Sequence, residues 1–246
     1  MSTSSSTART GSSMHQAAVA AAVCLLCCFV IATASRNGLY ATPLALWTDV
    51  AQKSPLKRRA HLNLGHVLSQ AGMFPQALQE LDIAGRIPED RDTPLSDVYR
   101  EISDVYLRTG RYQDAVTAGQ QGLQLAPFDA RLLGNVGLGL VRMQQFDRAL
   151  MYAERSYAAH PSPEAMTLLG EIHLAKGNAA QAVEYFLRAV YLSPDNAFNY
   201  WNAAVALARA GRYDDARKYL AAYMAREIDE ERRQSARGLM ETLQQQ

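Results

Sequence analysis

Cysteine is absent from the sequence after position 28. The three cysteines of the chain, Cys24, Cys27 and Cys28, all lie in one uncharged run near the N-terminus. Residues 29–246 can therefore form neither a disulfide framework nor a metal site with thiolate ligands. Because no cation or helix terminus in this run would stabilise a thiolate, we interpret the cysteines as small apolar residues rather than redox groups.

An excess of either charge is also absent. The 25 Lys and Arg residues are balanced by 24 Asp and Glu residues, which leaves a formal charge of +1. This balance excludes a protein that attracts nucleic acid through bulk positive charge, and we predict no nucleic-acid partner. The charged fraction of 20% is too high for a polytopic membrane protein and too low for a disordered chain.

Motifs that carry chemistry are missing as well. The chain has no dinucleotide-binding glycine motif, no phosphate-binding loop and no nucleophile-elbow motif. None of its five histidines is spaced as a ligand in a known metal motif, and His61 and His66 point in different directions on a helix. We therefore predict no catalytic residue, no metal site and no cofactor, and a protein that is not an enzyme.

The N-terminal region falls into two segments. Residues 1–16 are mostly Ser, Thr and Gly with one cation, and this composition predicts disorder. Residues 17–34 carry no charge and would span about 27 Å as a helix, which is near the minimum for crossing a bilayer. Both a single transmembrane helix and a signal peptide, with Ala32-Thr33-Ala34 as its cleavage site, fit this segment.

Small residues recur through the rest of the chain at one period. Alanines at positions 77, 115, 149, 182 and 216 are separated by 38, 34, 33 and 34 residues. A second row of small residues and a row of turn residues, mostly glycine, repeat these intervals. Around them, apolar side chains recur with helical spacing on each side of the turn, which predicts two helices per unit. The second row is Gly65, Ser103, Gly137, Gly170 and Ala204, and the turn row is Gly72, Gly110, Gln144, Gly177 and Gly211.

This pattern resembles the tetratricopeptide repeat family. The resemblance covers residues 58–228 as five units, at 58–91, 96–129, 130–162, 163–196 and 197–228. It implies an all-α, right-handed solenoid of about five helix hairpins. Two departures stand out, namely Gln144 in place of the turn glycine and a four-residue insertion, Asp92 to Leu95, which we expect to enlarge a loop.

Both ends of the repeat region have the pattern of caps. Residues 35–57 hold a linker and a half-repeat helix at 42–54, and residues 229–246 form an amphipathic capping helix, which such arrays need for solubility. The linker, with Arg36, Asn37, Tyr40, Trp47 and Pro55, resembles the linker that follows the membrane helices in bacterial membrane glycosyltransferase-like repeat proteins and their eukaryotic relatives.

The resemblance implies that the first helix of each unit lines a concave groove that binds other proteins or peptide segments. Asparagines at the sixth position match a groove-lining ladder in the repeats of O-linked N-acetylglucosamine transferases, although each could instead bond its own neighbours. Arginines at the thirteenth position would form a basic strip or a solvated face. Trp201 would be a binding anchor or pack on the capping helix. The predicted groove residues are Asn63, His66, Arg100, Arg108, Asn135, Arg142, Trp201, Asn202 and Arg209.

Together these features predict a non-enzymatic scaffold that is membrane-anchored or exported, with its repeats on the periplasmic or extracytoplasmic side. Such a protein would act in the assembly of an envelope or secreted complex, and would contact the membrane through residues 17–34 if these stay uncleaved. Two alternatives remain open. One is an adaptor held at the cytoplasmic face of a membrane, and the other is an accessory subunit of a glycosyltransferase or polysaccharide system.

Overall fold

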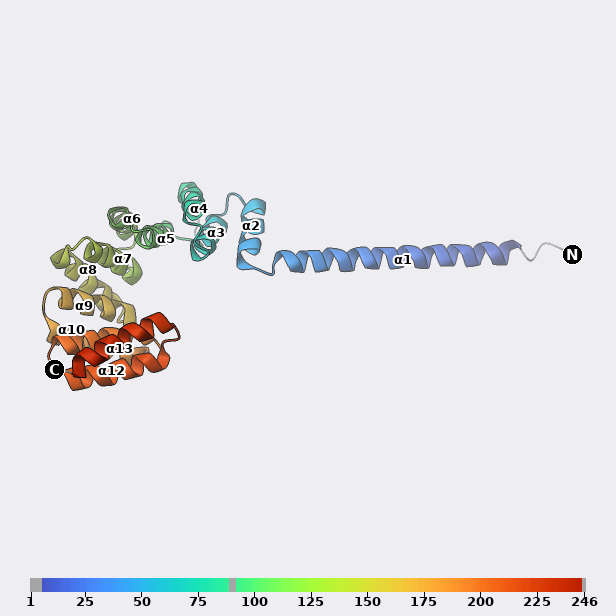
Figure 1. The fold of residues 1–246 in the computed structure, drawn as a ribbon. Coiled ribbons are helices and arrows are strands. Elements are labelled where there is room, and N and C mark those ends of the chain that lie inside the picture. Colours follow the sequence, from blue (N-terminus) through green and yellow to red (C-terminus); the bar gives the residue numbers. More distant parts are fainter. Residues whose placement is uncertain (1–5, 89–91, 245–246) are drawn as a thin grey trace. The chain divides into compact units, whose positions relative to one another are not determined.

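The computed structural model describes residues 6–88 and 92–244. These residues form thirteen helices and no strand (Figure 1), which confirms the predicted all-α fold. The chain separates into two compact units, Met1–Leu56 and Lys57–Gln246. The N-terminal unit holds helices α1 and α2, and the C-terminal unit holds helices α3 to α13.

Helix α1 spans Ser6–Leu39 and helix α2 spans Pro43–Lys53. Helix α1 includes residues 6–16, which the composition predicted to be disordered, whereas residues 1–5 lie outside the described part. Extending an existing helix costs far less than nucleating one, so the apolar run can carry this polar segment with it. The side chains of residues 18–33 are exposed all round. Within residues 6–88 and 92–244, no helix combines the length and the hydropathy that a membrane span requires.

The start of α2 follows from a capping pair. The Thr42 hydroxyl accepts a hydrogen bond from the backbone amide of Ala45 at 3.2 Å, and Pro43 occupies the first helical position, where its missing amide hydrogen costs nothing. Near the other end, Lys53 pairs with Asp49 one turn earlier at 2.7 Å. A helix therefore forms where the half-repeat was expected, and its role as a cap stays a prediction.

The C-terminal unit consists of five successive helix hairpins and a final helix (Figure 1). Four of the turns between paired helices use a glycine with positive φ, as expected, since only glycine adopts this conformation without strain. The third turn uses Gln144 at a φ of 59°. The hairpins are α3 (Arg58–Gln70) with α4 (Phe74–Arg86), α5 (Leu95–Arg108) with α6 (Tyr112–Leu125), α7 (Ala130–Arg142) with α8 (Phe146–Ala159), α9 (Pro163–Ala175) with α10 (Ala179–Leu192), and α11 (Ala197–Arg209) with α12 (Tyr213–Arg226).

The recurring small residues lie where paired helices approach most closely. All five periodic alanines are fully buried. In the first hairpin, a Cβ atom at Gly65 would lie 2.8 Å from Leu81 Cγ and 3.2 Å from the carbonyl oxygen of Ala77, so a larger residue fits only if these neighbours shift. In the second hairpin, the Ser103 hydroxyl donates a hydrogen bond to the carbonyl of Ala115 at 2.9 Å. The small residues therefore recur at this period because the two helices of each hairpin pack closely.

The insertion between the first two hairpins is held by a buried arginine. Arg58 is only 5% exposed, and its guanidinium donates hydrogen bonds to the backbone carbonyls of Ala84, Ile87 and Thr93 at 3.2, 2.5 and 2.7 Å. These carbonyls lie near the end of α4 and in the loop that follows it. Leu95, the last residue of the predicted insertion, is the first residue of α5.

Helix α13 (Glu230–Gln244) packs on α12 at the end of the unit. Its apolar side buries Ala236 and Leu243, and the guanidinium of Arg217 on α12 donates a hydrogen bond to the carbonyl of Leu243 at 2.7 Å. Its polar side carries ion pairs, such as Arg237 with Glu230 at 2.8 Å. This helix thus gives the last hairpin a polar outer surface, as the predicted cap requires.

Candidate functional site

The first helices of successive hairpins form one continuous wall. Helix α3 contacts α5, α5 contacts α7, α7 contacts α9, and α9 contacts α11. Two hollows open on this wall. The smaller, of about 340 Å³, lies between α3 and α5 beside residues 92–93, and the larger, of about 790 Å³, lies between α7 and α9 at the start of α11. The wall is therefore the surface that the repeats offer to a ligand.

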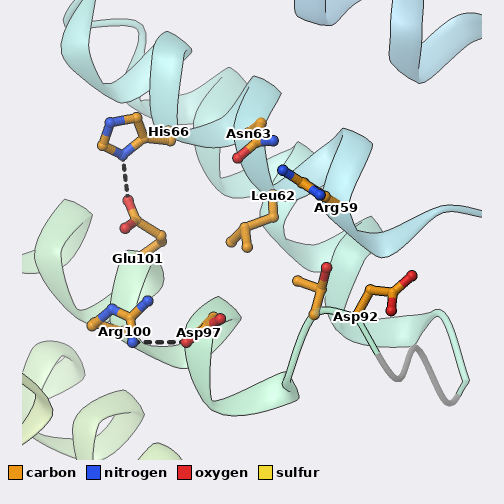
Figure 2. Close-up of a pocket in the computed structure, with 9 residues that line it drawn as sticks. Arg59, Leu62, Asn63, His66, Asp92, Asp97, Arg100 and Glu101 are labelled. Carbon is orange, nitrogen blue, oxygen red and sulfur yellow. Dashed lines mark hydrogen bonds and ion pairs between the residues drawn. The ribbon is translucent and has the colours of Figure 1, made fainter.

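The smaller hollow is lined by charged side chains that are largely paired with one another (Figure 2). His66 Nδ1 lies 2.8 Å from a carboxylate oxygen of Glu101. Arg100 bridges Asp97 and Asp129 at 2.7 and 3.0 Å. Although burial opposes the charge of Arg100, the carboxylates of Asp97 and Asp129 outweigh it and raise its pKa. Arg100 therefore stays charged and pairs two helices.

The lining of the larger hollow contains apolar residues and two charged residues of each sign. We refer to Gly134 and Leu138 of α7 and Leu168 of α9, which belong to this lining, as its floor. At one end, Arg142 lies 3.5 Å from Glu171. Burial raises the pKa of Glu171, and the nearby guanidinium of Arg142 only partly opposes this shift.

The other end of the larger hollow carries Arg131 and Glu164, together with His160. The two arginines of the lining are thus matched by two glutamates. The hollow consequently presents no excess charge of either sign to a ligand.

The predicted groove residues do not form a single site. Asn63, His66 and Arg100 line the smaller hollow. Asn135 and Arg142 line the larger one. The other four predicted residues, Arg108, Trp201, Asn202 and Arg209, line neither hollow. The predicted binding role of all nine residues stays a prediction.

Trp201 and Arg108 contact other parts of the repeat. The ring centroid of Trp201 lies 5.4 Å from that of Tyr223 on α12, within the apolar cluster that also contacts α13. The sequence left open packing on the capping helix, whereas this ring contact is made with α12. Arg108 donates a hydrogen bond to the Ser69 hydroxyl at 2.7 Å and lies over the Phe74 ring.

The asparagine at the sixth position of the third unit bonds to the preceding repeat. Asn135 Nδ2 donates to the backbone carbonyl of Arg100 at 3.4 Å, a long hydrogen bond. The Nδ2 atom of Asn202 is buried and has no hydrogen-bond partner among the described residues. Arg209 ends α11 with an exposed side chain. The asparagines thus differ in environment despite their shared position in the repeat.

Sequence reasoning did not identify the floor of the larger hollow. The sequence patterns predicted no binding role for Gly134, Leu138, Leu168 or Phe198. The missed signal was the absence of a side chain at Gly134 on the groove side of α7. Among the described residues, no group of three or more potential metal-binding side chains comes together.

Comparison with known proteins agrees with the repeat assignment. Two family models described as tetratricopeptide repeats match this chain, one at residues 137–197 and the other at residues 58–82 and 200–218. The predicted repeats are therefore confirmed over these residues. These matches do not support the resemblance predicted for the linker at residues 35–57 or the N-terminal membrane segment.

Curated relatives match part of this chain. The human Protein O-mannosyl-transferase TMTC1 is 26% identical over 166 residues, which is 65% of this chain and 18% of that protein. The chain spans about a fifth of the length of the curated relatives it matches.

Solved structures share the fold. PilF of Pseudomonas aeruginosa has a TM-score of 0.62 with 23% identity, over 70% of this chain and 77% of its own. YrrB, described as a TPR protein with an unusual peptide-binding site, has a TM-score of 0.55 with 20% identity, over 78% of this chain and 97% of its own. At these identities the likeness concerns the fold alone, and that fold is typical of protein interaction scaffolds.

Proposed function

We propose that this protein is a non-enzymatic scaffold that binds segments of partner proteins on the wall formed by the first helices of its hairpins. The observation that carries this proposal is the position of both hollows, which are lined mainly by residues of α3, α5, α7 and α9. A repeat array offers such a wall as an extended binding surface, because each hairpin adds one more exposed helix face. The peptide-binding description of YrrB, which shares the fold, supports the same reading.

The proposal extends to location. The described part of the uncharged segment exposes large apolar side chains, including Leu25, Phe29 and Ile31, each at least 68% exposed. Exposed apolar surface of this kind suits a targeting segment that a membrane or the export machinery recognises. We therefore propose that the repeats belong to an anchored or exported protein and lie on the extracytoplasmic side, where they would assist assembly of an envelope or secreted complex.

A second candidate function comes from the similarity to a mannosyltransferase. The human relative is 26% identical over 166 residues, and its name describes a mannosyl-transferase. The corresponding role for this chain is that of an accessory subunit, which would deliver protein substrates to a separate sugar-transferring enzyme. Sugar transfer by the purified chain alone would contradict the non-enzymatic proposal.

Site-specific photo-crosslinking in the producing cells tests the scaffold role. A photo-reactive amino acid replaces Asn135, which lines the larger hollow, or Glu184, an exposed residue on the second helix α10. We expect defined crosslinked partners from position 135 and none of these from position 184. Equal crosslinking from both positions, or no crosslink from position 135, would show that the wall of first helices is not the binding surface.

A further inference from the structure

The starting observation is a glycine that internal packing does not require. Gly134 lies in the first half of α7, where glycine weakens a helix relative to alanine. A Cβ atom at this position would meet only Ser156 Oγ, at 3.5 Å, an ordinary van der Waals contact. Alanine would therefore fit at position 134 without moving any neighbour.

The other two glycines of α7 are different. A Cβ atom at Gly137 would lie 3.0 Å from Leu168 Cδ2, and one at Gly139 would lie 2.8 Å from Val116 Cγ2. Both residues that would clash are themselves buried. Close packing thus accounts for Gly137 and Gly139 but leaves Gly134 unexplained.

The space that Gly134 leaves open belongs to the larger hollow. Leu138, one turn further along α7, and Leu168 of α9 line the same space, and so does Phe198 at the start of α11, which is 56% exposed. These four residues are part of the lining of a volume of about 790 Å³, which is large enough for a side chain and the peptide backbone that carries it.

The charges around this space identify the kind of side chain that fits it. Arg142 and Glu171 lie at one end, and Arg131 and Glu164 lie at the other, so each end holds one cation and one anion. A charged side chain between them would lose hydration without gaining a net countercharge. An uncharged apolar side chain would instead replace water on apolar surface, which is favourable.

We propose that the hollow above Gly134 is an anchor pocket for one bulky apolar side chain, leucine-sized or aromatic, of a peptide segment from a partner protein. This inference rests on the proposed scaffold function and adds the chemistry that the partner must carry. Leu138 and Leu168 form the floor of the pocket, and Phe198 also lines it. Gly134 is the residue that determines the depth of the pocket, because any larger side chain there fills it.

The test uses the full-length chain and a random library of displayed peptides. Each peptide is about long enough to cross α7, α9 and α11, the three first helices around the larger hollow. Peptides enriched on the wild-type chain are synthesised, and their affinities are measured by fluorescence anisotropy against wild type, Gly134→Ala and Gly134→Leu. We expect enriched peptides to share an apolar residue, whose replacement by serine weakens binding at least about tenfold. Gly134→Leu should weaken the same peptides by about tenfold or more, and Gly134→Ala by less.

Matched controls separate a pocket effect from a folding effect. Gly238 lies inside α13, and a Cβ atom there would meet nothing within 4 Å, so Gly238→Ala and Gly238→Leu make the same changes away from the wall. We expect both control variants to bind the peptides like wild type. Circular dichroism should show full helical content in all four variants, with Gly134→Ala melting no lower than wild type.

The outcomes distinguish the two levels of the proposal. If no peptide is enriched, the scaffold function itself is contradicted. If peptides bind but Gly134→Leu leaves every affinity unchanged, the wall binds partners elsewhere and the anchor pocket is wrong. If Gly134→Leu instead alters the mass of the particle in sedimentation, the occupant is a second copy of this chain, which also overturns the proposed partner.

Discussion

Replacing Gly170 with alanine tests the packing on which the repeat depends. Gly170 lies in the middle of α9, and a Cβ atom there would lie 2.6, 2.7 and 2.9 Å from three ring carbons of Phe186 on α10. The Phe186 ring is 1% exposed and sits in the apolar cluster of the last repeats, so it cannot move aside into solvent. The added methyl group must therefore push the two helices apart or force the ring out of its rotamer.

The magnitude follows from comparing this change with Gly134→Ala. Both substitutions replace a helical glycine and gain about 1 kcal/mol of helix propensity. Gly170→Ala alone adds an overpacking cost of about 1–3 kcal/mol, since only its Cβ contact falls below 3.0 Å. Propensity cancels in the difference, so Gly134→Ala should be more stable than Gly170→Ala by about 1–3 kcal/mol. For a unit of this size the two midpoints should differ by about 2–12 °C.

The assay is thermal and urea unfolding followed by far-ultraviolet circular dichroism, with Gly238→Ala as a third variant that gains propensity without any new contact. Shortening the opposing ring should relieve the clash, so Gly170→Ala should cost less in a Phe186→Leu background than in the wild type. Equal stability of Gly170→Ala and Gly134→Ala would refute the reasoning, because it would mean that the ring of Phe186 does not occupy the space beside Gly170.

Two further predictions concern buried charge. Arg58→Met should destabilise the first hairpin by about 3 kcal/mol or more in urea unfolding, because three backbone carbonyls lose their hydrogen-bond donor. Arg59→Met, at the exposed neighbouring position, should change the free energy of unfolding by no more than about 0.5 kcal/mol. Equal losses in the two variants would show that the hydrogen bonds of Arg58 do not stabilise the hairpin. Burial raises the pKa of Glu171, and Arg142 only partly opposes this. The protonated Glu171 carboxyl therefore contributes its full stabilisation at a pH below its pKa in the unfolded chain. This stabilisation is lost as the pH rises through the higher pKa that Glu171 has in the folded protein. Wild type should accordingly lose stability relative to Glu171→Gln over that rise in pH, and a constant difference between the two would show that Glu171 is not desolvated.

The helix hairpins were predictable because they depend on local rules that leave a mark on the sequence. Paired helices approach each other closely only where a small residue lies between them. The five periodic alanines, from Ala77 to Ala216, mark one such position in each hairpin. Positive φ at each turn favours glycine, which appears in four turns out of five. Gln144 shows that the shape of the turn persists without glycine, since its φ is 59°.

The partners that groove residues find in a neighbouring repeat were not predictable. Arg100 pairs with Asp97, three residues earlier on α5, at a spacing that helices commonly use for ion pairs, but it also pairs with Asp129 at the start of α7. Spacing along one helix identifies only neighbours on that helix, and Asp129 reaches Arg100 through the stacking of two hairpins. For the same reason the sequence left both roles of Trp201 open, because contact with Tyr223 depends on how α11 and α12 pack.

The three glycines of α7 show most clearly where sequence reasoning ends. In the sequence, Gly134, Gly137 and Gly139 form one cluster with one explanation, close packing. In the structure two of them face side chains at 3.0 and 2.8 Å, and the third faces an open hollow. A missing side chain allows either a close helix contact or a vacant space, and only the neighbouring repeat decides which one occurs. A glycine that costs helix stability without serving packing therefore points to the surface on which a partner can be bound.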